Sequence, residues 1–146
     1  MKERSEDHLA YPTFLFVEND VNDVLLVSRA FSKCGIPGLP RFVEDASELR
    51  AYLLGAGKYS DREQYPLPKL IMTDYRIAGG SAREIIQCVR CDANFKNVPV
   101  IVFSSFLPPR EVESILGAGA SACLEKPVSF SEFCKTLHGA LKFAQN

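Results

Sequence analysis

The sequence has no apolar run long enough to cross a membrane. Its longest apolar runs, such as VPVIVF at residues 98–103, fall far short of the roughly 20 residues that a membrane-spanning helix needs. The first ten residues (MKERSEDHLA) also lack the apolar stretch of a signal peptide. These absences predict a cytoplasmic protein without a membrane partner.

The sequence also lacks an excess of charge of one sign. Its 17 Lys and Arg residues stand against 18 Asp and Glu residues, which gives a net charge of -1. A basic excess is typical of proteins that bind nucleic acid or anionic lipid. We therefore expect no direct nucleic-acid partner, and any electrostatic function has to be local.

An even, regularly spaced set of cysteines is missing as well. A chain of 146 residues buries enough surface to fold without disulfide bonds. Cys88 and Cys91 form a C-x-x-C pair, but a zinc site needs about four ligands, and the two histidines lie near opposite ends of the chain. We therefore predict reduced thiols rather than disulfides or a metal site at positions 34, 88, 91, 123 and 134.

The order of apolar segments predicts a single α/β domain. Short, almost wholly apolar runs bounded by polar residues, Pro or Gly predict buried strands at 14–17, 70–73, 98–104, 122–125 and, more weakly, 41–43. Between these strands, apolar residues recur at helical spacing. The predicted inward faces are Val24, Val27, Phe31 and Cys34; Leu49, Tyr52 and Leu53; Ile85, Ile86 and Val89; Val112, Ile115 and Leu116; and Phe133, Leu137, Leu141 and Ala144.

The ends of these helices have sequence signals of their own. Gly35 and Gly55 suit helix stops, Pro108-Pro109 suits a helix start, and residues 129–132 have the S-x-x-E form of a capping box. Strands that are apolar on both faces and alternate with helices indicate a parallel sheet covered on both sides. We therefore predict a doubly wound five-stranded parallel sheet over residues 11–146, after a polar tail at 1–10. The polar segment Gly55–Pro68 is expected to be a long loop inside the domain.

Polar residues follow four of the predicted strands at their carboxyl ends, which is where open parallel sheets bind ligands. They are Glu18, Asn19 and Asp20 after the first strand, Asp74 after the third, Ser104 and Ser105 at the end of the fourth, and Lys126 after the fifth. Clustered carboxylates favour a hard divalent cation such as Mg2+. A lysine and a hydroxyl can hold a phosphoryl oxygen, and a carboxylate beside them can act as a nucleophile. Asp74 is the best candidate for that nucleophile.

These residues resemble a known family. The run from Thr13 to about Phe143 is similar to the receiver domain of two-component response regulators, through the acidic patch after the first strand and the segments LIMTD, PVIVFSS and GASACLEKP. The segments VENDVNDVLL and KNVPVIVFSS, with the long loop before the third strand, further resemble the stand-alone receivers that partner bacterial phytochromes and related sensor kinases.

The resemblance implies a flavodoxin-like (βα)5 fold with strand order 2-1-3-4-5. It implies that Asp74 accepts a phosphoryl group from a sensor histidine kinase or a phosphotransfer protein, and that Ser104 and Lys126 hold that group. Mg2+ would lie among Glu18, Asn19, Asp74 and the backbone carbonyl of Arg76, and the Lys126–Pro127 bond would be cis. The protein would signal through contacts with an unidentified protein partner, with a homodimer also open, and would catalyse only its own phosphoryl transfer and dephosphorylation.

The sequence departs from the family at several positions. Asn19 stands where the family has an aspartate, and we expect Asp20 to turn inward as a replacement ligand. Ala78 replaces a proline, Ser81-Ala82 replaces Asp-Gly, and Cys123 replaces the aromatic residue that reports phosphorylation.

Two other functions compete with the phosphorylatable receiver. One is a pseudo-receiver, which binds partners without phosphate because Asn19 weakens its metal site. The other is an acylphosphate-forming hydrolase, which needs a D-x-D pair after the first strand, whereas this chain has Glu18 in the first position.

Overall fold

The computed structural model describes residues 11–77 and 80–144. The predicted tail at 1–10 and the substitution at Ala78 lie outside the described residues. A short antiparallel pair of strands, β4 (Arg76–Ile77) and β5 (Gly80–Ser81), was not expected from the sequence patterns.

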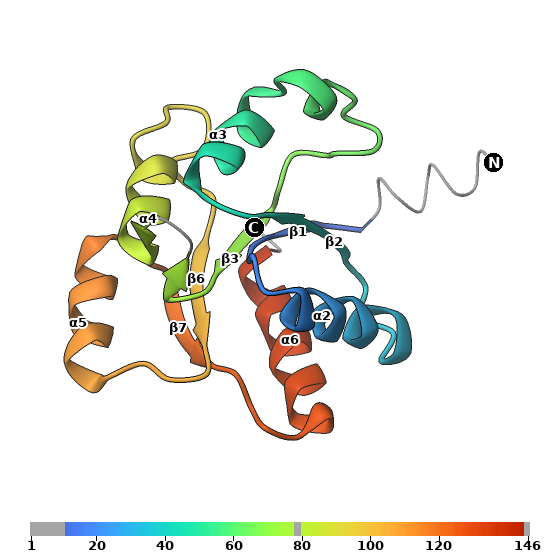
Figure 1. Cartoon of the computed structure of the whole chain (residues 1–146), viewed down its shortest axis with the longest axis vertical. Helices are drawn as coiled ribbons and strands as arrows, with labels where there is room; N and C mark the ends of the chain where they lie inside the picture. Colours follow the sequence, from blue (N-terminus) through green and yellow to red (C-terminus); the bar gives the residue numbers. More distant parts are fainter. Residues whose placement is uncertain (1–10, 78–79, 145–146) are drawn as a thin grey trace.

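Five parallel strands form the central sheet in the order β2-β1-β3-β6-β7 (Figure 1). They are β1 (Thr13–Val17), β2 (Leu39–Val43), β3 (Leu70–Thr73), β6 (Val100–Ser104) and β7 (Ala122–Glu125). All residues of β1, β3 and β6 are buried, because helices cover both faces of the sheet. The predicted flavodoxin-like fold and strand order are confirmed. The fourth strand begins at Val100 rather than Val98, and the weak second strand extends back to Leu39.

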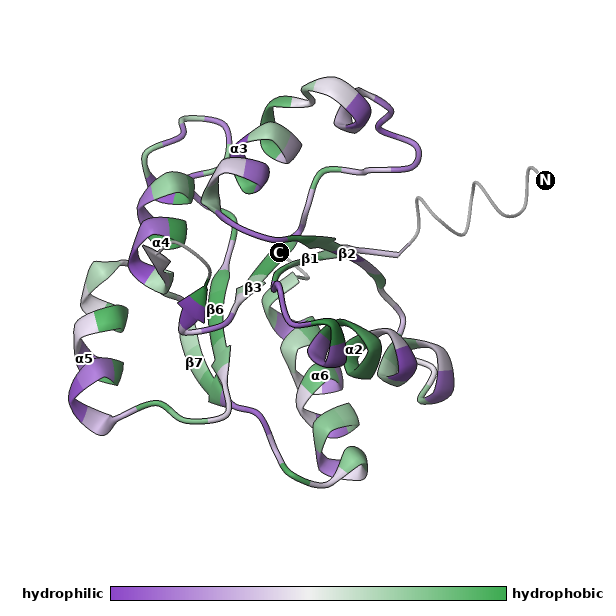
Figure 2. Cartoon of the chain, in the orientation of Figure 1, coloured by the Kyte–Doolittle hydropathy of each residue, from purple (hydrophilic) through white to green (hydrophobic). Residues whose placement is uncertain are grey.

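The helices divide between the two faces of the sheet. On one face, α2 (Val21–Lys33) and α6 (Phe130–Ala144) share an apolar cluster with the strands. On the other face, α3 (Ala46–Leu54), α4 (Ala82–Arg90) and α5 (Pro109–Ala118) share a second cluster. The central strands are strongly hydrophobic, while each helix also carries hydrophilic residues (Figure 2). Every helix within the described ranges is too short or too polar to span a bilayer.

The helix ends follow the predicted signals. Gly55 ends α3 with a φ of 71°, a left-handed conformation that glycine adopts without steric cost. The hydroxyl oxygen of Ser129 accepts a hydrogen bond from the Glu132 N–H at 3.0 Å, which caps α6 as the S-x-x-E pattern predicts. Asp20 caps α2 in the same way.

Three local predictions are wrong. Leu116 is 43% exposed, whereas its neighbour Ile115 is fully buried, because α5 presents a narrower face to the domain than the pattern predicted. The Gly55–Pro68 segment contains a 3-10 helix, η1 (Gly57–Ser60), whose Tyr59 packs between other tyrosines.

The Lys126–Pro127 bond is trans, as are all peptide bonds of the described residues. The expectation of a cis bond rested on the resemblance alone.

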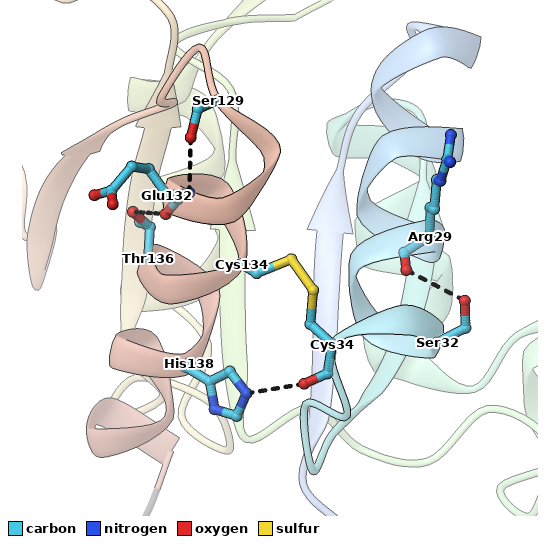
Figure 3. The surroundings of a disulfide bond; sticks show 8 residues. All are labelled: Arg29, Ser32, Cys34, Ser129, Glu132, Cys134, Thr136 and His138. Carbon is cyan, nitrogen blue, oxygen red and sulfur yellow. Dashed lines mark hydrogen bonds between the residues drawn. A yellow bond between two sulfur atoms is a disulfide. The ribbon is translucent and has the colours of Figure 1, made fainter.

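The prediction that all five cysteines are reduced is wrong for two of them. Cys34 and Cys134 form a disulfide between α2 and α6 (Figure 3). Cys88, Cys91 and Cys123 are free. The pairing joins residues 100 positions apart and arises because α2 and α6 cover the same face of the sheet, which cysteine spacing does not reveal.

Candidate functional site

A lysine surrounded by three carboxylates lies at the carboxyl edge of the sheet. The Lys126 Nζ atom is 3.1 Å from Asp74 Oδ2, 3.2 Å from Glu18 Oε1 and 3.4 Å from Asp23 Oδ2. The Lys126 side chain is only 8% exposed, so water screens these ion pairs weakly. The structure thus brings together the predicted residues Glu18, Asp74 and Lys126, and adds Asp23 to them.

The strand ladder fixes the backbone of this cluster. The Glu18 N–H donates to the Val43 carbonyl at 2.8 Å, so the chain is held one residue beyond β1. The Lys126 N–H donates in the same way to the Ser104 carbonyl at 2.8 Å. Side chains that follow neighbouring parallel strands therefore meet at one edge, as predicted.

Asp23 is the third acid of the cluster, whereas Asp20 caps a helix. The Asp20 carboxylate accepts hydrogen bonds from the N–H groups of Asn22 and Asp23, which makes it the N-cap of α2. Asp20 is exposed, and its side chain caps the helix instead of turning inward as we expected. Asp23 lies in the first turn of the helix, on the side of Lys126. Recognising Asp20 as a cap would have pointed to Asp23 as the third acid.

The cluster carries an excess of negative charge, since three carboxylates face one ammonium. Burial raises the pKa of Glu18, and the Asp74 carboxylate adds to this rise, although Lys126 opposes both. Burial would lower the pKa of Lys126, but the carboxylates of Asp74, Glu18 and Asp23 outweigh it and raise that pKa. Lys126 therefore stays protonated, and one cation does not neutralise its surroundings.

The three carboxylates fit a divalent cation. One oxygen from each of Glu18, Asp23 and Asp74 lies within 4.8 Å of the others, and hard carboxylate oxygens are the ligands that Mg2+ prefers. Within residues 11–77 and 80–144, no other group of three or more His, Cys, Asp or Glu side chains gathers in this way, and the Cys88 and Cys91 pair takes part in none.

Three other predicted residues lie outside these ion pairs. Asn19 is exposed and lines a hollow of about 320 Å³ beside α2 and β2. Ser104 is buried, and its hydroxyl donates to the Phe106 carbonyl at 3.2 Å. Arg76 is exposed in β4, where its backbone pairs with Ser81. Their roles at the site remain predictions.

Tyr75 links the Asp74 loop to α5, a contact that sequence reasoning missed. Its N–H donates to Asp74 Oδ1 at 2.7 Å, and its hydroxyl donates to the Glu111 carboxylate in the first turn of α5. The hydrogen bond to Glu111 is the main reason that the pKa of Tyr75 is raised. The partners are 36 positions apart, so no local pattern could have predicted the pair.

Solved structures with the same architecture cover nearly the whole chain. The response regulator RPA3017, from red light signaling of R. palustris, has a TM-score of 0.83 and 24% identity, and the match covers 92% of this chain and 94% of that one. The chain has the receiver-domain fold of response regulators. The receiver fold recurs in the phosphorylated cyanobacterial phytochrome response regulator RcpA, with a TM-score of 0.77 and 22% identity over 91% of this chain and 93% of that one. The Mn(2+)-bound form of response regulator Rcp1 matches with a TM-score of 0.73 and 23% identity over 90% and 93% of the two chains.

Sequence comparison gives the same family name over a shorter span. The two-component response regulator ARR17 of Arabidopsis thaliana is 35% identical over 63 residues, which are 43% of this chain and 41% of the relative. The match thus spans about two-fifths of that relative's length. No family model matches the chain. The comparisons confirm the resemblance to response regulator receivers, including those of phytochrome signalling.

Proposed function

We propose that this receiver domain accepts a phosphoryl group on the Asp74 carboxylate from a sensor histidine kinase or a phosphotransfer protein. The observation that carries the proposal is the 3.1 Å ion pair between Asp74 and Lys126 inside an acidic cluster at the carboxyl edge of the sheet. The Asp74 carboxylate attacks phosphorus, the bond from phosphorus to the donor histidine breaks, and the imidazole nitrogen keeps the electron pair of that bond.

Lys126 and Ser104 hold the transferred group in this proposal. The Lys126 ammonium is already paired with Asp74 and would move to a phosphoryl oxygen as the acyl phosphate forms. The Ser104 hydroxyl would leave the Phe106 carbonyl and donate to a second phosphoryl oxygen. Both groups are buried, so each interaction is stronger than it would be in water.

Glu18, Asp23 and Asp74 would hold the Mg2+ that this transfer needs. The excess of carboxylate oxygen and the Mn(2+)-bound neighbour both support a divalent cation. When bound, Mg2+ supplies positive charge that stabilises charge on the phosphoryl oxygens. The Asn19 side chain and the Arg76 carbonyl remain proposed further ligands, while Asp23 takes the place that we first assigned to Asp20.

The pseudo-receiver remains the second candidate, and Asn19 is the observation in its favour. Asn19 brings no charge to the site, but Asp23 supplies a third carboxylate and so offsets that loss. The hydrolase has less support, because Asp20, which would have to complete its motif, caps α2 and is exposed. We therefore retain the phosphorylated receiver, which signals through a protein partner or a second copy of itself and acts on no other substrate.

Intact-mass measurement after incubation with acetyl phosphate and Mg2+ tests the proposal. The wild type should gain one phosphoryl group and Asp74→Asn none. Asp92→Asn is the matched control, since Asp92 lies outside the cluster, where its carboxylate accepts a hydrogen bond from the Asn94 N–H. If the wild type stays unmodified with acetyl phosphate and with a panel of histidine kinases, the pseudo-receiver replaces this proposal.

A further inference from the structure

The disulfide joins two helices that cover one face of the sheet. Cys34 is the C-cap of α2 and Cys134 lies in the second turn of α6, with 6.3 Å between their Cα atoms (Figure 3). This separation is within the range that disulfides bridge. One turn further along α6, the His138 Nε2 atom lies 3.3 Å from the Cys34 carbonyl oxygen. Residues of α6 thus contact the end of α2 at two points.

Cys34 and Cys134 differ in their exposure to solvent. Cys134 is 5% exposed, whereas Cys34 is half-buried and lies between exposed Lys33 and Gly35. A small thiol or disulfide therefore reaches Cys34 first, and thiol–disulfide exchange requires such access. A chain of this length with apolar clusters on both faces does not need a crosslink to fold. The pair is thus free to open and close without loss of the domain.

The first turn of α2 and the segment just before α6 also meet at the acidic site. Asp23 in the first turn of α2 pairs with Lys126, which lies just before α6. With 13 residues, α2 is about 20 Å long. An ion pair therefore holds the site end of α2, and the disulfide holds its far end.

We propose that Cys34 and Cys134 are a reversible thiol–disulfide switch that sets how firmly α2 is held against α6. A small disulfide such as oxidised glutathione is the oxidant. The Cys34 thiolate attacks it and forms a mixed disulfide, which releases one glutathione thiol. The Cys134 thiolate then attacks the Cys34 sulfur and displaces the second glutathione thiol. The two cysteines lose two electrons and two protons, both protons end on the glutathione thiols, and reduced glutathione reverses each step.

Counting accessible thiols tests whether the bond forms and opens. Wild-type protein is equilibrated with oxidised or reduced glutathione, denatured and alkylated without further reduction. Its intact mass is then measured by mass spectrometry. Since the chain has five cysteines, the mass after oxidation should show one internal disulfide and three further cysteines that are each alkylated or bound to glutathione, and the mass after reduction should show five alkylated cysteines, in either order of treatment. Cys34→Ser should show four alkylated or glutathione-bound cysteines after oxidation and four alkylated cysteines after reduction. Five alkylated or glutathione-bound cysteines in the oxidised wild type would show that no internal bond forms, and an internal disulfide that persists after reduction would show a permanent crosslink; either result overturns the switch.

Hydrogen exchange tests what the switch does to the helices. Reduction should speed exchange several-fold at 28–34 and 130–138 and leave α5 (109–118), on the other face, unchanged. Cys34→Ser should match the reduced wild type in both buffers. Equal exchange in the oxidised and reduced wild type would overturn the effect on α2 and α6, and this comparison uses no variant that might misfold.

Discussion

The helices on the two faces of the sheet are connected to the acidic cluster at its carboxyl edge in different ways. On one face, α2 carries Asp23, α6 follows Lys126, and a disulfide joins the two helices. On the other face, α5 is linked to the Asp74 loop through the hydrogen bond between Tyr75 and Glu111. The first face has a covalent and an ionic attachment, while the second is attached by a hydrogen bond from Tyr75, the residue next to Asp74. We therefore expect the α5 face to carry the response to phosphorylation.

Removing the covalent attachment should have the largest effect. In oxidising buffer, Cys34→Ser is expected to lower the free energy of unfolding by about 2–4 kcal/mol, because the crosslink closes a long loop and so restricts the unfolded chain. Cys123→Ser removes a free thiol near the other face and should cost less than about 1 kcal/mol. Urea unfolding of the two variants gives the comparison. Equal stabilities of Cys34→Ser and the wild type in oxidising buffer would show that the disulfide does not stabilise the α2 and α6 face.

Loss of the ionic attachment should weaken Mg2+ binding. Asp23→Asn removes one of three carboxylates, and a charge next to a divalent ion is worth on the order of 1 kcal/mol even at high dielectric. Isothermal titration should therefore show a Kd raised by roughly fivefold. Asp20→Asn is the matched control, because asparagine caps a helix as well as aspartate does. A larger loss in the control would assign the ligand to Asp20 after all.

The α5 face should respond to a phosphoryl mimic. With beryllofluoride, hydrogen exchange at 104–112 should slow several-fold, because the Tyr75 link adjoins Asp74 and the Ser104 hydroxyl is proposed to leave the Phe106 carbonyl for the phosphoryl group. Exchange at 120–125 should change little, since Cys123 is too small to report the motion by rotation of a ring. A dominant change around Cys123, or on α6, would reverse the comparison of the two faces.

Tyr75→Phe should separate phosphorylation from its transmission. The ring and the backbone N–H to Asp74 remain, so the phosphoryl group should still be gained, whereas the response at 109–112 should be lost. Tyr59→Phe removes a similar hydrogen bond, to Glu48, away from Asp74 and serves as the control. The link carries no signal if both variants respond as the wild type does.

Restoring the family's charge at position 19 should have the smallest effect. Asn19→Asp should tighten Mg2+ binding by less than Asp23→Asn weakens it, because an exposed carboxylate is more strongly screened by water and salt. Titration of the two variants at one ionic strength compares them directly. A larger gain at Asn19 than the loss at Asp23 would show that position 19, rather than Asp23, supplies the stronger ligand.

What could be predicted from the sequence depended on local patterns. The bounds of β3 and β7 follow from apolar runs, and the meeting of Glu18, Asp74 and Lys126 follows from the rule for parallel strands. The disulfide and the Tyr75 link depend on which helices share a face, and no spacing encodes that.

The acidic loop shows how two local roles compete. Asp20 suits both a metal ligand and a helix cap, and the N–H groups of the first turn of α2 need a cap. The cap prevails, and Asp23 supplies the third carboxylate one turn later.

The position of the phosphoryl group tests the central claim most directly. After incubation with acetyl phosphate and Mg2+, borohydride reduction converts an aspartyl phosphate to homoserine, which survives digestion with trypsin. Cleavage after Lys69 and Arg76 releases residues 70–76 (LIMTDYR), in which Asp74 is the one acidic residue. Homoserine at position 74 is the predicted result. Homoserine at Asp20, Asp23 or any other aspartate would contradict the assignment of Asp74 as the acceptor.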